Sequence, residues 1–221
     1  MLLSGVSAQA QRISRLSSGF DIGTGYAKEA WAPSFLYYQM INPPRQSWLQ
    51  LGWGVRGWGY YTQRNTSFLA PNGAGSQDTL RLGQISANGA SFVLAVNFRL
   101  GKIDIGANAD VIGLAFGKKR NGLYVLSNLG MASDSALKYQ GTLLPTAPRN
   151  INALPFIYKN ANGQAEAYVR IWFSEQVGLK LGYVLGQSAY RLDMRLNNNQ
   201  RYFGHAYGMP YVALALPVFN Q

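Results

Sequence analysis

The sequence predicts an all-β fold: a closed, antiparallel, up-and-down barrel of eight strands in a single domain. Three observations predict it. The segment from Ser91 to Gly117 consists of two runs of alternating side chains joined by the dipeptide Gly101-Lys102, which is the pattern of a β-hairpin. Similar runs recur along the 221 residues, a length that suits one domain. After a short first connection at residues 28–32, the segments between the runs alternate between short and long, as expected when turns gather at one end of a barrel and loops at the other.

Residues 1–17 precede the first strand and are expected to form an N-terminal tail. They contain a short apolar run followed by Ala8-Gln9-Ala10, the small-residue pattern of a secretory cleavage site. We interpret the tail as the remnant of a signal peptide, with an ordinary flexible tail as the alternative, and assign residues 18–221 to the barrel. Alternation and Gly, Asn and Pro punctuation predict strands at residues 18–27, 33–42, 46–63, 88–100, 102–116, 164–173, 177–191 and 203–219.

The first three strands differ in how clearly their two faces are marked. In the first strand, Asp21 shares a face with small residues. In the second strand both faces are apolar or aromatic, so neither face can be assigned. In the third strand Leu51, Trp53 and Val55 lie on one face and Arg56 lies on the other. The glycines on the charged faces of the strands, Gly52, Gly54 and Gly106 among them, are expected to make room for the long arginines.

The hairpin supplies the fourth and fifth strands. In the fourth strand Leu94 and its apolar neighbours at every second position oppose Arg99. In the fifth strand Ile105 and its neighbours oppose Asp104 and Asp110. Each strand therefore has one apolar face and one face that carries charge.

The last three strands continue this pattern. Glu166 and Arg170 oppose an apolar face in the sixth strand, and Lys180 opposes one in the seventh. The eighth strand contains Pro210, which cannot donate a ladder hydrogen bond. We expect a β-bulge at this proline, because every strand of a closed barrel pairs on both sides.

The connections divide into two classes. After the second, fourth and sixth strands the chain turns within a few residues, at Pro43-Pro44-Arg45, Gly101-Lys102 and Ser174-Glu175-Gln176. After the third, fifth and seventh strands it runs for 24, 47 and 11 residues. An even number of strands with short turns at one end and long loops at the other is the arrangement of transmembrane barrels.

The apolar faces of the clearly patterned strands carry no charged residue, which favours contact with lipid. An arginine on such a face would cost about 2 to 4 kcal/mol near the bilayer midplane. The opposite faces would then line a lumen in which acids and bases pair and plug the interior, although a proton or small-solute path is an alternative. The predicted charge network consists of Asp21, Arg56, Arg99, Asp104, Asp110, Glu166, Arg170 and Lys180.

Over residues 18–219 the periodicity and loop asymmetry resemble the small, eight-stranded outer-membrane β-barrels of Gram-negative bacteria. The resemblance implies an outer-membrane location, periplasmic turns, extracellular loops and insertion by the outer-membrane assembly machinery. Members of this family usually end at an aromatic residue. Here Phe219 is followed by Asn220 and Gln221, so this assembly signal is displaced.

The formal charge of +11 concentrates in the long connections, which suggests an anionic partner. We expect membrane lipid, and specifically the phosphates of lipopolysaccharide headgroups, as partners, with a solvated loop surface as the alternative. Nucleic acid is not expected, because no recognised module is present. The sequence leaves the loop ligand and the oligomeric state open. The candidate anion-binding residues are Lys118, Lys119, Arg120, Lys138, Arg149 and Lys159.

The sequence offers little support for catalysis. With no cysteine and one histidine, neither a metal site nor a cofactor is expected. Gly52-Trp53-Gly54-Val55-Arg56-Gly57 matches a dinucleotide fingerprint but lies within a predicted strand. A non-enzymatic structural or surface-interaction role is therefore our first hypothesis. The alternatives are a barrel hydrolase of lipid A or phospholipid using Ser188, Asp193 and His205, and a soluble, lipocalin-like barrel that binds an apolar ligand.

Overall fold

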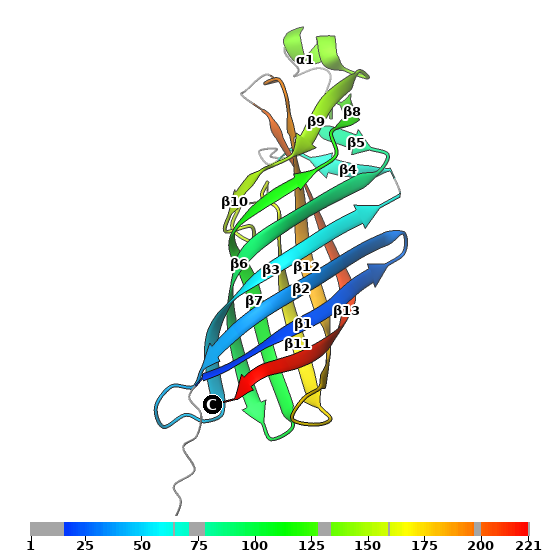
Figure 1. Ribbon diagram of the computed structural model, residues 1–221. Coiled ribbons are helices and arrows are strands. Elements are labelled where there is room, and N and C mark those ends of the chain that lie inside the picture. Colours follow the sequence, from blue (N-terminus) through cyan, green and yellow to red (C-terminus); the bar gives the residue numbers. More distant parts are fainter. Residues whose placement is uncertain are drawn as a thin grey trace, which may run out of the picture.

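The computed structural model describes residues 16–63, 65–70, 78–127, 134–158, 160–196 and 200–220 (Figure 1). Within these ranges the chain forms one antiparallel sheet of thirteen strands that curls into a ring, together with one short helix, α1 (Asp134–Tyr139). The prediction of an all-β fold is confirmed. No helix in the described ranges is long and apolar enough to cross a membrane. Residues 1–15 of the predicted tail lie outside the described residues, and Leu16 and Ser17 belong to the first strand instead of the tail.

Eight long strands account for the eight segments predicted from the sequence. They pair in chain order, and the last pairs with the first, so their hydrogen bonding closes on itself. We call this circuit the long-strand ring. It consists of β1 (Leu16–Ala27), β2 (Ala30–Ile41), β3 (Leu49–Thr62), β6 (Ile85–Leu100), β7 (Ile103–Gly117), β11 (Gly163–Trp172), β12 (Gly178–Leu192) and β13 (Tyr202–Asn220).

Five short strands in the long connections were not predicted. They are β4 (Thr66–Leu69), β5 (Thr79–Leu82), β8 (Arg120–Val125), β9 (Leu143–Pro148) and β10 (Ile151–Ala153). Strand β10 extends the sheet beside β7, whereas the other four pair in series from β13 through β4, β5, β8 and β9 to β12. Since β12 also pairs with β13, these six strands close a second circuit, the upper ring, above the long-strand ring (Figure 1).

The two rings differ in that, among the described residues, buried charges lie inside only one of them. The upper ring encloses an apolar core in which the side chains are at most 1 % exposed: Phe68, Leu80, Leu82, Tyr124, Tyr190, Leu192 and Phe203. The long-strand ring encloses the buried charged side chains, including Asp21, Arg56 and Lys180, each 0 % exposed, together with apolar ones such as Tyr38 and Met40. The long connections therefore form a packed extension of the sheet at one end of the molecule.

The outward face of the long-strand ring below the upper ring is apolar. Leu94 is 52 % exposed and Val55 is 46 % exposed, and no charged side chain points outward on this part of the described strands. The structure also assigns the faces of β2, which the sequence left open. Leu36 and Met40 are buried inside the ring, and Phe35 is exposed outside it.

The turn of the central hairpin follows from the geometry of its first residue. Gly101 has φ +66°, and Leu100 and Ile103 on either side of Gly101-Lys102 are paired, as in a two-residue type II′ turn. The bulge predicted at Pro210 is wrong, because Pro210 pairs in register with Tyr183. Pairing with β1 ends at Tyr211, so a strand partner flanks Pro210 on one side only, a position that proline tolerates. The irregularity in β13 lies at Val218 instead.

Candidate functional site

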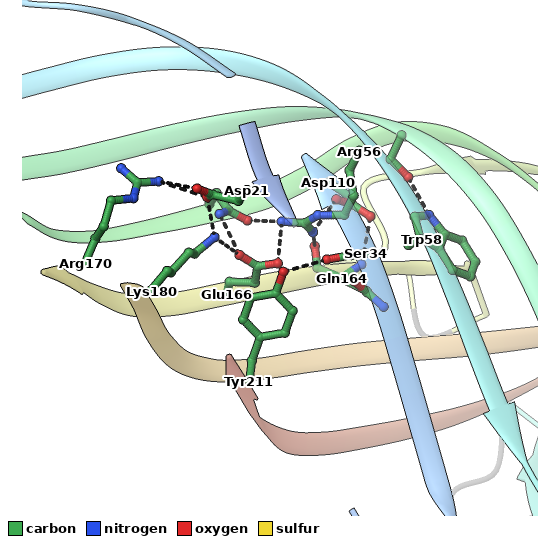
Figure 2. A network of polar contacts seen from close by, with 12 residues as sticks. Asp21, Ser34, Arg56, Trp58, Asp110, Gln164, Glu166, Arg170, Lys180 and Tyr211 are labelled. Atoms are coloured by element: carbon green, nitrogen blue, oxygen red, sulfur yellow. Dashed lines mark hydrogen bonds and ion pairs between the residues drawn. The ribbon is translucent and has the colours of Figure 1, made fainter. Parts of the chain in front are cut away.

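The candidate functional site is a chain of buried charges along the lumen of the long-strand ring (Figure 2). We call this series the buried charge chain. Its acidic and basic side chains alternate through successive ion pairs, so each residue between its two ends contacts a partner of opposite charge on both sides. From the turn end upward, the order is Arg99, Asp104, Arg170, Asp21, Lys180, Glu166, Arg56 and Asp110. These are the eight residues of the predicted network, and the structure brings all of them together.

The upper half of the buried charge chain is centred on Arg56 of β3. One terminal nitrogen lies 2.7 Å from Asp110 of β7, and the other lies 3.0 Å from Glu166 of β11. Asn108 accepts a hydrogen bond from Arg56 and donates one to Glu166. Asp110 also accepts a hydrogen bond of 2.9 Å from the backbone nitrogen of Gln164. Three strands are thus tied together across the lumen.

The lower half of the buried charge chain is centred on Arg170 of β11. A terminal nitrogen lies 2.9 Å from Asp21 of β1, and the other lies 3.5 Å from Asp104 of β7. Asp104 also receives a hydrogen bond of 2.8 Å from the indole of Trp172 and lies 3.3 Å from Nε of Arg99. The Arg99 side chain is 37 % exposed, so the lower end of the buried charge chain is a cation that reaches solvent.

Four acids and four bases make the network neutral. This balance is required, because an unpaired ion in a low-dielectric interior costs several kcal/mol. Except for Arg99, these side chains are at most 3 % exposed. Within the described residues, the arrangement fills the lumen with paired charges and contains no cluster suited to a metal ion.

Aromatic residues complete the network, and sequence reasoning did not include them. The ring of Tyr168 lies 4.3 Å from Nζ of Lys180 and 5.2 Å from the guanidinium carbon of Arg170. A Cβ on Gly106 would lie 2.6 Å from the hydroxyl of Tyr168. The expectation that the inner glycines make room for arginines is therefore wrong: Gly106 makes room for a tyrosine, and the space beside Gly52 and Gly54 is taken by Met40 and Leu36. Tyr168 lies two residues from both Glu166 and Arg170, so strand parity was the signal that could have placed it on the charged face.

The hydrolase candidates do not form a hydrogen-bonded series. Ser188 and His205 are partners across β12 and β13, but the Ser188 hydroxyl has no hydrogen-bond partner among the described residues. His205 lies beside β4, higher on the molecule than the apolar part of the outer face. The centre of its ring lies 5.6 Å from that of Phe68, and burial lowers the pKa of its imidazole. The carboxylate of Asp193 lies 3.9 Å from Lys119 instead.

The candidate anion-binding residues are dispersed. Lys118, Lys119 and Lys138 are exposed at the upper end. Arg149 is occupied, since it donates hydrogen bonds to Asn160 at 2.9 and 3.0 Å and its guanidinium lies 4.8 Å from the ring centre of Tyr202. Lys159 lies outside the described residues.

Arg120 differs from the other candidates because it lines a pocket of about 470 Å³ at the upper rim of the long-strand ring. Tyr26, Trp31 and Tyr61 line the same pocket, together with Glu29. Trp31 and Tyr61 are stacked, with their ring centres 5.4 Å apart. This pocket combines a cation with exposed aromatic side chains at the edge of the apolar face.

Comparison with known proteins adds no functional assignment: no protein-family model and no curated protein matches the chain.

Proposed function

We propose that this chain is a non-enzymatic, eight-stranded outer-membrane β-barrel, and that its upper ring projects from the membrane to contact anionic components of the cell envelope. The short turns face the periplasm, and the upper ring faces the outside. The barrel serves as a closed anchor, because paired charges fill its lumen and an apolar core fills the ring above it.

The apolar outward face is the observation that carries this proposal. Large apolar side chains are half exposed around the long-strand ring, and the charged side chains point inward and are paired. A protein in water would be expected to reverse this arrangement, whereas a barrel in lipid requires it, since lipid offers no partner for a charge. Ring closure also satisfies the backbone hydrogen bonds that lipid cannot.

The position of the exposed aromatic residues supports an upper membrane boundary at the rim. Tyr26 is 66 % exposed and Trp31 is 48 % exposed, and both lie where β1 and β2 meet at their upper turn. Amphipathic rings favour the headgroup level of a bilayer. Arg120 in the adjoining pocket would then meet lipid phosphates, with which arginine forms charge-assisted hydrogen bonds.

Membrane fractionation with electrophoresis of unheated and heated samples tests the barrel. We expect the protein in the membrane fraction, and a change in mobility on heating as the closed ring unfolds. A protein that remains in aqueous solution without detergent and shows no heat-dependent shift would favour the lipocalin-like alternative.

Native mass spectrometry of the detergent-solubilised protein with lipid A tests the surface role. Arg120→Gln removes the pocket's cation, and we expect about tenfold weaker binding, since a hydrogen bond to a charged group contributes about 1.5 to 3 kcal/mol. Arg45→Gln is the matched control, because it removes an exposed arginine at the lower turns, at the opposite end from the pocket. Equal binding by both variants would remove Arg120 from the proposal, and hydrolysis of lipid A would indicate the hydrolase instead.

A further inference from the structure

The lower mouth of the long-strand ring holds a cavity of about 370 Å³ that neither the anchor nor the upper ring uses. We call it the lower vestibule. The starts of β1 and β3, the ends of β2, β6, β11 and β13, and two of the three hairpin turns at this end surround it. Its lining combines the cations Arg99, Lys102 and Arg170 with the rings of Tyr38, Trp172 and Phe173.

The buried charge chain presents its positive end to the vestibule. Arg99 pairs with Asp104 through Nε, and its two terminal nitrogens have no partner among the described residues. Lys102 adds a second exposed cation at the hairpin turn, and its Nζ also has no partner in the described part of the chain. These donors are suited to an anion, because a guanidinium binds carboxylate or phosphate in two parallel hydrogen bonds.

Arg170 supplies a third cation at the inner end of the vestibule. Its side chain is 3 % exposed and its Nε has no hydrogen-bond partner among the described residues, although its terminal nitrogens are paired with Asp21 and Asp104. Asp104 is already shared by Arg99, Arg170 and Trp172. Glu175, on the exposed turn, is the one acid among the described residues that line the vestibule. The local field therefore favours a negative ligand near Arg99.

The rest of the vestibule wall is suited to a flat apolar group. Tyr38, Trp172, Phe173 and Pro217 line it. Tyr38 and Trp172 are held in place by the guanidinium of Arg170, whose carbon lies 4.7 and 5.4 Å from their ring centres. A pocket with apolar walls and a few fixed polar groups is the usual form of a small-molecule site.

We propose that the lower vestibule binds a small organic anion whose carboxylate or phosphate group is held by Arg99 and Lys102 and whose aromatic body lies against Trp172 and Phe173. The site lies on the periplasmic side in the orientation proposed above. Its geometry does not require the upper ring or the rim pocket, so its test is independent of the lipid A experiment.

Isothermal titration calorimetry of the detergent-solubilised protein with phenyl phosphate and benzoate tests this inference. We expect at least one of the two to bind, and uncharged phenol to bind at least tenfold more weakly. Arg99→Gln should weaken binding of the anion at least tenfold, Lys102→Gln should weaken it several-fold, and Arg99→Lys should restore part of the affinity. Lys28→Gln is the matched control, because Lys28 is an exposed turn lysine at the opposite end of β1 and β2.

Each contrary result is decisive. Absence of binding by both anions at millimolar concentration would overturn the inference, as would equal binding by Arg99→Gln and Lys28→Gln. Phenol binding as strongly as the anions would show an apolar pocket without anion recognition. The heat-dependent gel shift of each variant identifies those that fold, and Arg99→Lys and Lys102→Gln keep the test open if Arg99→Gln does not.

Discussion

Lys180 is the residue that joins the two halves of the buried charge chain. Its Nζ lies 3.0 Å from Asp21 and 2.5 Å from Glu166, and its side chain is 0 % exposed. Asp21 belongs to the lower half with Arg170, and Glu166 belongs to the upper half with Arg56. Removing this one ammonium group leaves a net negative charge inside the ring.

We therefore expect Lys180→Met to destabilise the protein by about 3 to 5 kcal/mol, the usual effect of removing one partner from a buried ion pair. Urea unfolding in lipid vesicles measures this. Lys138→Met is the matched control, since Lys138 is exposed, and should change the free energy of unfolding by less than about 0.5 kcal/mol. Equal unfolding midpoints for the two variants would mean that the network does not stabilise the fold.

Strand parity was sufficient to predict which charges share the lumen, because a period of two residues is a local property of each strand. It did not predict the order of the pairs. Asp21 and Lys180 are 159 residues apart in sequence, and their contact depends on how far each strand is staggered against the next around the ring. That stagger depends on the closure of the whole sheet, which no local pattern specifies.

At the scale of the strand, the apolar outer face makes a position-dependent prediction. Leu94 lies near the middle of β6 and is 52 % exposed. Leu94→Arg is expected to lower the free energy of unfolding in lipid vesicles by about 2 to 4 kcal/mol, because the guanidinium would enter the hydrocarbon. Leu143→Arg in β9 of the upper ring is the control; Leu143 is 65 % exposed and should tolerate the charge in water. Two equally small effects would contradict lipid contact at Leu94.

The upper ring makes a second prediction at this scale. Phe68 and Leu69 are neighbours on β4, but Phe68 is 0 % exposed inside the apolar core and Leu69 is 45 % exposed. Phe68→Ala should destabilise the upper ring by about 3 to 5 kcal/mol through loss of burial and the cavity left behind. Limited trypsin digestion checks this: cleavage at the upper end should accelerate in Phe68→Ala and remain unchanged in Leu69→Ala. Equal cleavage rates would mean that the core does not hold the extension together.

The short strands show where prediction of elements from the sequence stops. The long strands carry enough alternating positions to be recognised, whereas β4 and β5 have four residues each and β10 has three. Such short segments are not stable alone. Strands β4 and β5 form here because their neighbours in the upper ring supply hydrogen bonds and an apolar core, and β10 forms because it pairs with β7. Their existence is a consequence of the closed fold rather than of local sequence.

At the scale of the whole molecule, the two rings together determine what can pass through it. The long-strand ring is filled by seven charged side chains at most 3 % exposed, and the upper ring above it is filled by apolar side chains. An ion crossing the molecule would have to break several buried ion pairs and then displace a packed core, and each step costs several kcal/mol.

We therefore expect no steady current when the purified protein is inserted into a planar lipid bilayer. Phe68→Ala should remain non-conducting as well, because it loosens the upper ring and leaves the buried charge chain intact. Stepwise conductance of the wild-type protein that rises with salt concentration would contradict a closed anchor, whereas conductance of Phe68→Ala alone would locate the seal in the upper ring.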